Sequence, residues 1–62
     1  MDKVNINSAS VEELIQIIHI GKKRAEKLID RRPYKDIFEL SNVLGLGYKR
    51  MLDILNQKKA TV

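Results

Sequence analysis

The chain has 62 residues, 44% hydrophobic and 32% charged, which suits one small folded domain but not a core plus an enclosed active site, so we do not expect an enzyme. It has no cysteine and one histidine, which excludes disulfides, thiolate zinc sites and a histidine metal cluster, so neither a metal nor a cofactor is expected. The net charge is +4, and seven of the twelve basic residues fall within residues 22–35, which favours a polyanionic partner, nucleic acid before membrane.

The first predicted unit, hairpin one, covers about residues 10–31. Ser10 precedes Glu13 by three positions, the spacing of a capping box at the start of a helix. In segment 15–20 the residues alternate as in a strand and many are β-branched, so a short strand is the competing interpretation. The cap before the segment and Gly21 after it favour a helix. A second helix follows the glycine. The apolar stripes of the two helices comprise Val11, Leu14, Ile17, Ile18, Ala25, Leu28 and Ile29.

Residues 32–35 form the predicted linker between two hairpins. Pro33 disfavours helical geometry at Arg32, which places the end of the second helix there. Tyr34 in the linker and Phe38 just after it are the large aromatic residues of this region. We expect both side chains to fill the core beneath the connection.

Hairpin two, about residues 36–57, is predicted from an internal repeat. Segment 10–30, SVEELIQIIHIGKKRAEKLID, aligns without a gap with segment 36–56, DIFELSNVLGLGYKRMLDILN. The cap spacing, apolar phase, glycine and basic pair all recur, which a chance match would not preserve together. Its apolar stripe comprises Phe38, Leu40, Val43, Met51, Ile54 and Leu55. Because neither hairpin can bury its stripe alone, we expect one all-α domain over residues 1–62, with the hairpins packed face to face as a pseudo-two-fold pair.

Each hairpin carries a glycine turn that leads into a helix, at Gly21 and at Gly45 to Gly47. The first amides of a helix lack intrahelical acceptors, and together with the helix dipole they form a site for a phosphate oxygen. Glycine lets the backbone approach such a ligand closely. The competing interpretation is that these glycines are only a helix C-cap and a turn. His19 is expected as a turn residue at positive φ, with donation to a phosphate as the alternative.

Apolar and basic residues flank these turns. Ile20 and Leu46 are expected to point inward and anchor the turns in the core. Basic pairs at residues 23–24 and 49–50 would add charge-assisted contacts to the phosphate. Because such a site touches the phosphate backbone and not the base edges, it would carry no sequence preference.

The turns resemble a known motif. The pattern h-x-x-h-x-G-h-G-x-x-x-A, where h is apolar, is similar to the helix-hairpin-helix motif, and the tandem copies resemble the (HhH)2 domain. The opening VNINSA and the EEL at residues 12–14 are similar to the ComEA-type competence DNA-receptor family, over about residues 4–57. His19 stands where that family has its first glycine, and the linker is several residues shorter.

The resemblance implies an all-α, SAM-like (HhH)2 fold and DNA binding without sequence preference. The DNA is expected to be double-stranded and contacted on the minor-groove side of its backbone. The candidate DNA-binding residues are Gly45, Leu46, Gly47, Lys49 and Arg50 in hairpin two, and Ile20, Gly21, Lys22, Lys23 and Arg24 in hairpin one.

Two other functions are compatible with the sequence. The alternative is a protein-interaction module that retains the fold without DNA binding, and a third possibility is a targeting appendage of an enzyme such as a nuclease. We expect a monomer, with DNA, a larger parent chain or a protein as partner. No apolar run approaches the roughly 20 residues of a membrane span, so no membrane contact is expected within this segment. The location would be cytoplasmic for a whole protein and extracytoplasmic for part of a membrane-anchored receptor.

Overall fold

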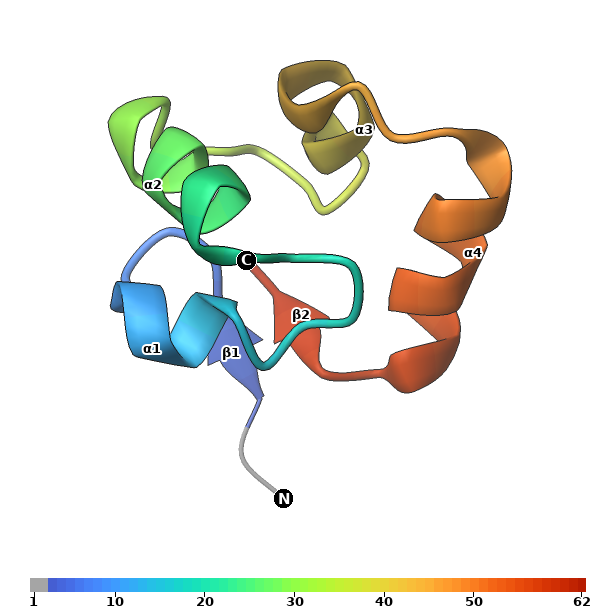
Figure 1. Ribbon diagram of the computed structural model, residues 1–62, viewed down its shortest axis with the longest axis horizontal. Helices are drawn as coiled ribbons and strands as arrows, with labels where there is room; N and C mark the ends of the chain where they lie inside the picture. Colours follow the sequence, from blue (N-terminus) through green and yellow to red (C-terminus); the bar gives the residue numbers. More distant parts are fainter. Residues whose placement is uncertain (1–2) are drawn as a thin grey trace.

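Two helical hairpins make up most of the computed structural model, which describes residues 3–62 (Figure 1). The elements are β1 (Val4–Asn5), α1 (Val11–Leu14), α2 (Lys22–Asp30), α3 (Glu39–Leu44), α4 (Tyr48–Gln57) and β2 (Ala60–Thr61). Helix α2 packs against α1 and α3, and α3 packs against α4, so the helices follow one another around the core (Figure 1). The prediction of an all-α fold with four main helices is confirmed for the described residues.

A parallel strand pair joins the two ends of the described chain, and the sequence analysis missed it. Val4 lies opposite Ala60 and Asn5 opposite Thr61. The Val4 amide donates to the Lys59 carbonyl at 2.7 Å, and the Ile6 amide donates to the Thr61 carbonyl at 2.8 Å. Strands of two residues are too short to show the alternation that identifies a strand in a sequence.

The core draws side chains from both hairpins and from the segment before α1. Its largest fully buried side chains are Ile6, Leu14, Ile17, Leu28, Leu40 and Ile54. Met51 is also buried, as predicted from its place on the apolar stripe. The buried residues among residues 3–62 are all aliphatic, apart from Met51 and Tyr34, so burial of apolar area is the main stabilising contribution.

Helix α1 is shorter than predicted. Its capping box is present: the Glu13 amide donates to Ser10 Oγ at 3.3 Å, and the Ser10 amide donates to Glu13 Oε1 at 2.9 Å. The helix nevertheless ends after Leu14, and the chain continues through turns. In one of these turns the Ile17 amide donates to the Leu14 carbonyl at 3.0 Å. β-Branched residues from position 15 onward weaken the helix there. Ile18, predicted for the buried stripe, is therefore 41% exposed.

Hairpin two begins with only half of the predicted capping box. The Asp36 amide donates to Glu39 Oε2 at 3.3 Å, but Asp36 Oδ1 accepts from the Phe38 amide at 3.0 Å instead of from the Glu39 amide. Helix α3 consequently begins at Glu39, and Phe38 is its N-cap. The prediction that Phe38 fills the core is wrong, because its side chain is 60% exposed.

The linker is tied to the segment before α1 through Tyr34. Its buried hydroxyl donates to the Leu28 carbonyl at 2.7 Å, and its amide donates to Asn7 Oδ1 at 2.6 Å. Asn7 Nδ2 in turn donates to the Tyr34 carbonyl at 3.0 Å, and Arg32 Nη1 donates to the Ala9 carbonyl at 3.0 Å. The prediction that Tyr34 is a core residue is confirmed.

The environment of Tyr34 predicts a pH dependence of stability. Burial raises the pKa of its phenol above the ordinary value of 10.0. The positive charges of Arg32 and Arg31 lower this pKa, but by less than burial raises it. The unfolded chain therefore releases this proton at a lower pH than the folded chain, and the free energy of unfolding should fall as pH rises above 10.0. Tyr34→Phe should remove the part of this decline that comes from the phenol. At neutral pH it should lower the free energy of unfolding by about 1 kcal/mol, because the hydrogen bond of the hydroxyl is lost.

Denaturant unfolding at neutral pH and above pH 10.0 measures both effects. Tyr48→Phe, which removes an exposed phenol, is the control and should retain the wild-type decline. An identical decline in Tyr34→Phe and the wild type would contradict the prediction.

Candidate nucleic-acid interface

The two hairpin turns share their backbone conformation at equivalent positions on either side of the buried residue. His19 and Gly45 occupy equivalent positions and are both left-handed, with φ of 69° and 65°. The next residues, Ile20 and Leu46, are buried, at 5% and 7% exposure. The glycines that follow are extended N-caps, of α2 in hairpin one and of α4 in hairpin two. The sequence repeat is therefore a structural repeat, and the predicted positive φ of His19 and the inward anchoring by Ile20 and Leu46 are confirmed.

The backbone conformation at the end of α3 favours glycine at position 45. Its left-handed conformation ends α3, where its amide donates to the Ser41 carbonyl, and the Leu46 amide donates to the same carbonyl at 3.1 Å. This is the arrangement of a glycine C-cap, in which a side chain would be strained. The interpretation of the glycines as a C-cap thus holds for Gly45.

Gly21 and Gly47 differ, because nothing in the described fold requires glycine there. Their φ values are −96° and −76°, which any residue adopts. A Cβ atom on either would meet no other atom within 4 Å. Neither glycine provides a side-chain hydrogen bond to its helix, whereas serine or aspartate at an N-cap would do so. The first amides of α2 and α4 are therefore open to an external acceptor, and the glycine before them has no side chain that would hinder its approach.

Exposed basic side chains follow each glycine. Lys22 and Lys23 lie in the first turn of α2, and Lys49 and Arg50 in the first turn of α4. Within residues 3–62 none of these four side chains forms a hydrogen bond or an ion pair. Arg24 differs from its counterpart Arg50, since its Nη1 donates to the His19 carbonyl at 3.0 Å. Arg24 supports the turn of hairpin one, while Arg50 is available to a ligand.

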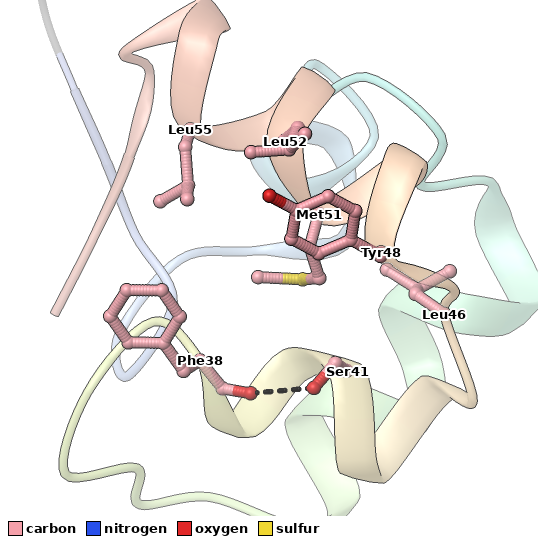
Figure 2. Close-up of a pocket in the computed structure, with 7 residues that line it drawn as sticks. All are labelled: Phe38, Ser41, Leu46, Tyr48, Met51, Leu52 and Leu55. Atoms are coloured by element: carbon pink, nitrogen blue, oxygen red, sulfur yellow. Dashed lines mark hydrogen bonds between the residues drawn. The ribbon is translucent and has the colours of Figure 1, made fainter.

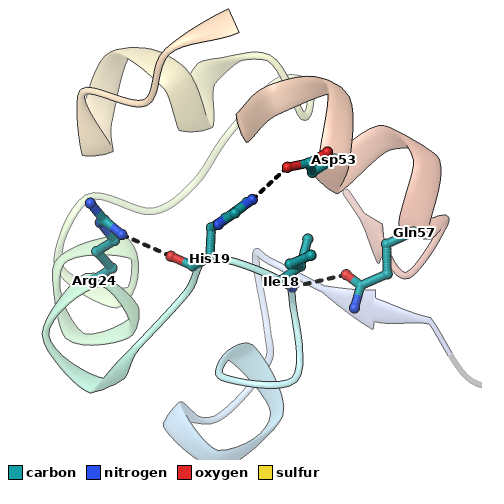
Figure 3. A network of polar contacts seen from close by, with 5 residues as sticks. All are labelled: Ile18, His19, Arg24, Asp53 and Gln57. Atoms are coloured by element: carbon teal, nitrogen blue, oxygen red, sulfur yellow. Dashed lines mark hydrogen bonds and ion pairs between the residues drawn. The ribbon is translucent and has the colours of Figure 1, made fainter. Parts of the chain in front are cut away.

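Polar contacts hold the turn of hairpin one against α4 (Figure 3). His19 Nε2 lies 2.7 Å from Asp53 Oδ2. The Ile18 amide donates to Gln57 Oε1 at 3.0 Å, and Gln57 Nε2 donates to the Gln16 carbonyl at 3.2 Å. These contacts span more than thirty positions of the chain, so no local pattern could have indicated Asp53 or Gln57. The alternative in which His19 donates to a phosphate loses support, because Asp53 engages its Nε2.

Across residues 3–62 no three histidine, cysteine, aspartate or glutamate side chains gather as metal ligands. In the same part of the chain, every helix is too short or too polar to cross a bilayer.

Two comparisons with known proteins found a match. The family model described as helix-hairpin-helix motif matches residues 1–57. A protein named deoxyribonuclease from Thioalkalivibrio sp. (strain K90mix) is 36% identical over 59 residues, which cover 95% of this chain. The chain spans 16% of the length of that relative. No solved structure matches the chain significantly.

The similarity to a deoxyribonuclease corrects the expectation that the chain is not an enzyme. That expectation took 62 residues as a self-sufficient unit, too small to enclose an active site. The matched relative is a far longer protein, of which this sequence corresponds to a small part. The length of the chain therefore does not exclude a relation to a nuclease.

The family is established by sequence and geometry together. Both turns contain a left-handed residue and an extended glycine, and each leads into a helix without a side-chain cap. The family match covers nearly the whole chain. The narrower resemblance to the competence DNA receptors is not tested by these matches and stays a prediction. This chain belongs to the helix-hairpin-helix family.

Proposed function

We propose that this chain binds DNA without sequence preference, as the DNA-binding segment of a longer nuclease. The observation that carries the proposal is the open N-cap glycine, which occurs twice. At Gly21 and Gly47 the fold leaves room for a side chain and the backbone permits one, yet the sequence has glycine at both. Close approach of an external ligand to the amides accounts for that choice.

The ligand chemistry follows from the groups around the two glycines. Amides at a helix N-terminus carry the positive end of the helix dipole and suit an anionic oxygen. Lysine and arginine side chains in the same turn strengthen a phosphate contact. Family membership and the name of the matched deoxyribonuclease both support DNA as the source of that phosphate. A duplex presents many equivalent phosphates, so such contacts position the protein without selecting a sequence.

Each residue of the proposed site has its own role. Gly21 and Gly47 would admit the phosphates to the amides, while Lys22, Lys23, Lys49 and Arg50 would supply positive charge. Buried Ile20 and Leu46 would hold the turns in place without touching DNA, and Arg24 would brace the turn of hairpin one. We infer that hairpin two is the stronger site, because Arg50 is available where Arg24 is engaged.

Titration of a labelled random-sequence duplex over a range of salt concentrations tests the proposal. If the two hairpins neutralise about four phosphates, the logarithm of the binding constant should fall against the logarithm of salt with a slope of about −3 to −4. We expect affinity of the order of micromolar, and equal affinity for duplexes of unrelated sequence. No binding at low salt would overturn the proposal in favour of a protein partner.

A further inference from the structure

Hairpin two carries exposed aromatic residues that the phosphate site does not use. Tyr48 is 79% exposed and Phe38 60% exposed. Both border an open hollow of about 250 Å³ between α3 and α4, and Figure 2 shows Met51 behind the Tyr48 ring, on the side toward Phe38. The hollow is lined by Phe38, Ser41, Leu46, Tyr48, Met51, Leu52 and Leu55.

The internal repeat provides a comparison within the same molecule. The position equivalent to Tyr48 in hairpin one is Lys22, and the position equivalent to Phe38 is Glu12; both are exposed charged residues. Hairpin one also forms a left-handed residue followed by an extended N-cap glycine, without aromatic residues at these positions. The aromatic pair is therefore not needed to build the hairpin, and its exposure keeps most of both rings out of the core.

The hollow is continuous with the phosphate site of hairpin two. Tyr48 follows Gly47 directly and is the first residue of α4, and the Leu46 side chain forms both the anchor of the turn and part of the wall. Exposed Lys49 and Arg50 come next along the helix. Acidic groups lie at the Phe38 end of the hollow, where the Glu39 carboxylate accepts from the Asp36 amide. An occupant with one anionic and one flat apolar part would thus place its anion at the Tyr48 end.

We propose that hairpin two binds an unpaired nucleotide, with its phosphate on the amides after Gly47 and its base stacked on the Tyr48 ring. This inference rests on the proposed function, because it assumes that the amides hold a DNA phosphate. A nucleobase has the required flat apolar face, and every base has one, so stacking adds affinity without sequence preference. A base in a duplex is already stacked, so Tyr48 distinguishes unpaired DNA from duplex.

Binding of two single strands of equal length and charge tests the inference. One is a short oligodeoxythymidine, and the other is an abasic strand with the same number of phosphates. At one salt concentration the wild-type chain should bind the base-containing strand about tenfold more tightly. Tyr48→Ala should abolish this preference while leaving affinity for the abasic strand unchanged, and Tyr48→Phe should retain it because the ring is kept.

Matched controls separate stacking from charge and from folding. Lys22→Ala, at the equivalent position of hairpin one, should weaken binding of both strands by the same factor and leave the preference intact. Circular dichroism melting of Tyr48→Ala should match the wild type, because the side chain is largely exposed.

Three results would overturn the inference. Equal affinity of the wild type for both strands, with duplex binding intact, would overturn it while leaving the proposed function in place. Failure to bind any DNA would overturn both. Self-association of the chain in sedimentation equilibrium that Tyr48→Ala abolishes would assign the hollow to a second copy.

Discussion

Replacement of Gly47 by aspartate is expected to stabilise the protein and, at the same time, to weaken its binding to duplex DNA at least tenfold. The glycine is an extended N-cap at φ −76° and ψ 171°, without a side-chain bond to its helix. Aspartate fits that conformation, and its carboxylate would cap α4 and complement the helix dipole. The gain should be about 0.5–1 kcal/mol, which is roughly 2–8 °C in melting temperature for a domain of this size.

The same carboxylate would occupy the amides that we assign to a phosphate and would repel its charge. Loss of a charge-assisted hydrogen bond costs about 1.5–3 kcal/mol, hence the expected loss of at least tenfold in affinity. Thermal melting and duplex titration on one protein preparation measure the two opposite effects. A variant cannot lose binding through unfolding if its melting temperature has risen.

Two further glycine variants are matched controls for Gly47→Asp. Gly21→Asp should stabilise the protein by a similar amount but weaken binding less, because we place the stronger site in hairpin two. Gly45→Ala puts a side chain into the left-handed region and should destabilise by about 1–2 kcal/mol, yet leave binding intact below its melting temperature. Wild-type affinity in Gly47→Asp would refute the phosphate site, and a greater loss in Gly21→Asp would reverse the order of the hairpins.

Leu46→Ala is expected to lower the free energy of unfolding by about 2–4 kcal/mol. Leu46 is only 7% exposed and belongs to the buried core at the tip of hairpin two. Truncation would remove buried apolar area and leave a void that the turn cannot close, because the left-handed Gly45 and the bond to the Ser41 carbonyl fix its path. A domain of this length has a total stability of only about 3–9 kcal/mol, so the variant should be close to unfolding.

Leu52→Ala is the control for Leu46→Ala. Leu52 is also a leucine of hairpin two and borders the same hollow, but its side chain is partly exposed, so its truncation should cost about 1 kcal/mol or less. Guanidinium unfolding of both variants gives the two free energies. Equal costs would mean that Leu46 does not anchor the turn.

Features encoded by local pattern were the ones that sequence could predict. The spacing of Ser10 and Glu13 predicted a capping box that the structure contains. His19 was predicted at positive φ, because histidine tolerates that region better than most side chains, and it has that conformation, as does its counterpart Gly45. The burial of Ile20 and Leu46 followed from their place between a turn residue and a helix start.

Features that depend on distant contacts could not be predicted in this way. The length of α1 was overestimated, because an apolar period fits a helix and a series of turns equally well over so few residues. Phe38 was assigned to the core by its chemistry alone, whereas its position at the start of α3 exposes it. The pairings of Asn7 with Tyr34 and of His19 with Asp53 join segments whose proximity exists only after the hairpins have packed.

The parallel pairing of β1 and β2 determines how this domain would respond to tension. The two strands run in the same direction, with Val4 opposite Ala60 and Asn5 opposite Thr61. A force that draws the two chain ends apart therefore pulls the strands along their own length in opposite senses. The bonds from the Val4 and Ile6 amides are then loaded together, in shear, and do not open one after the other. Mechanical load carried along the chain would meet its resistance at this strand pair before it reached the hairpins.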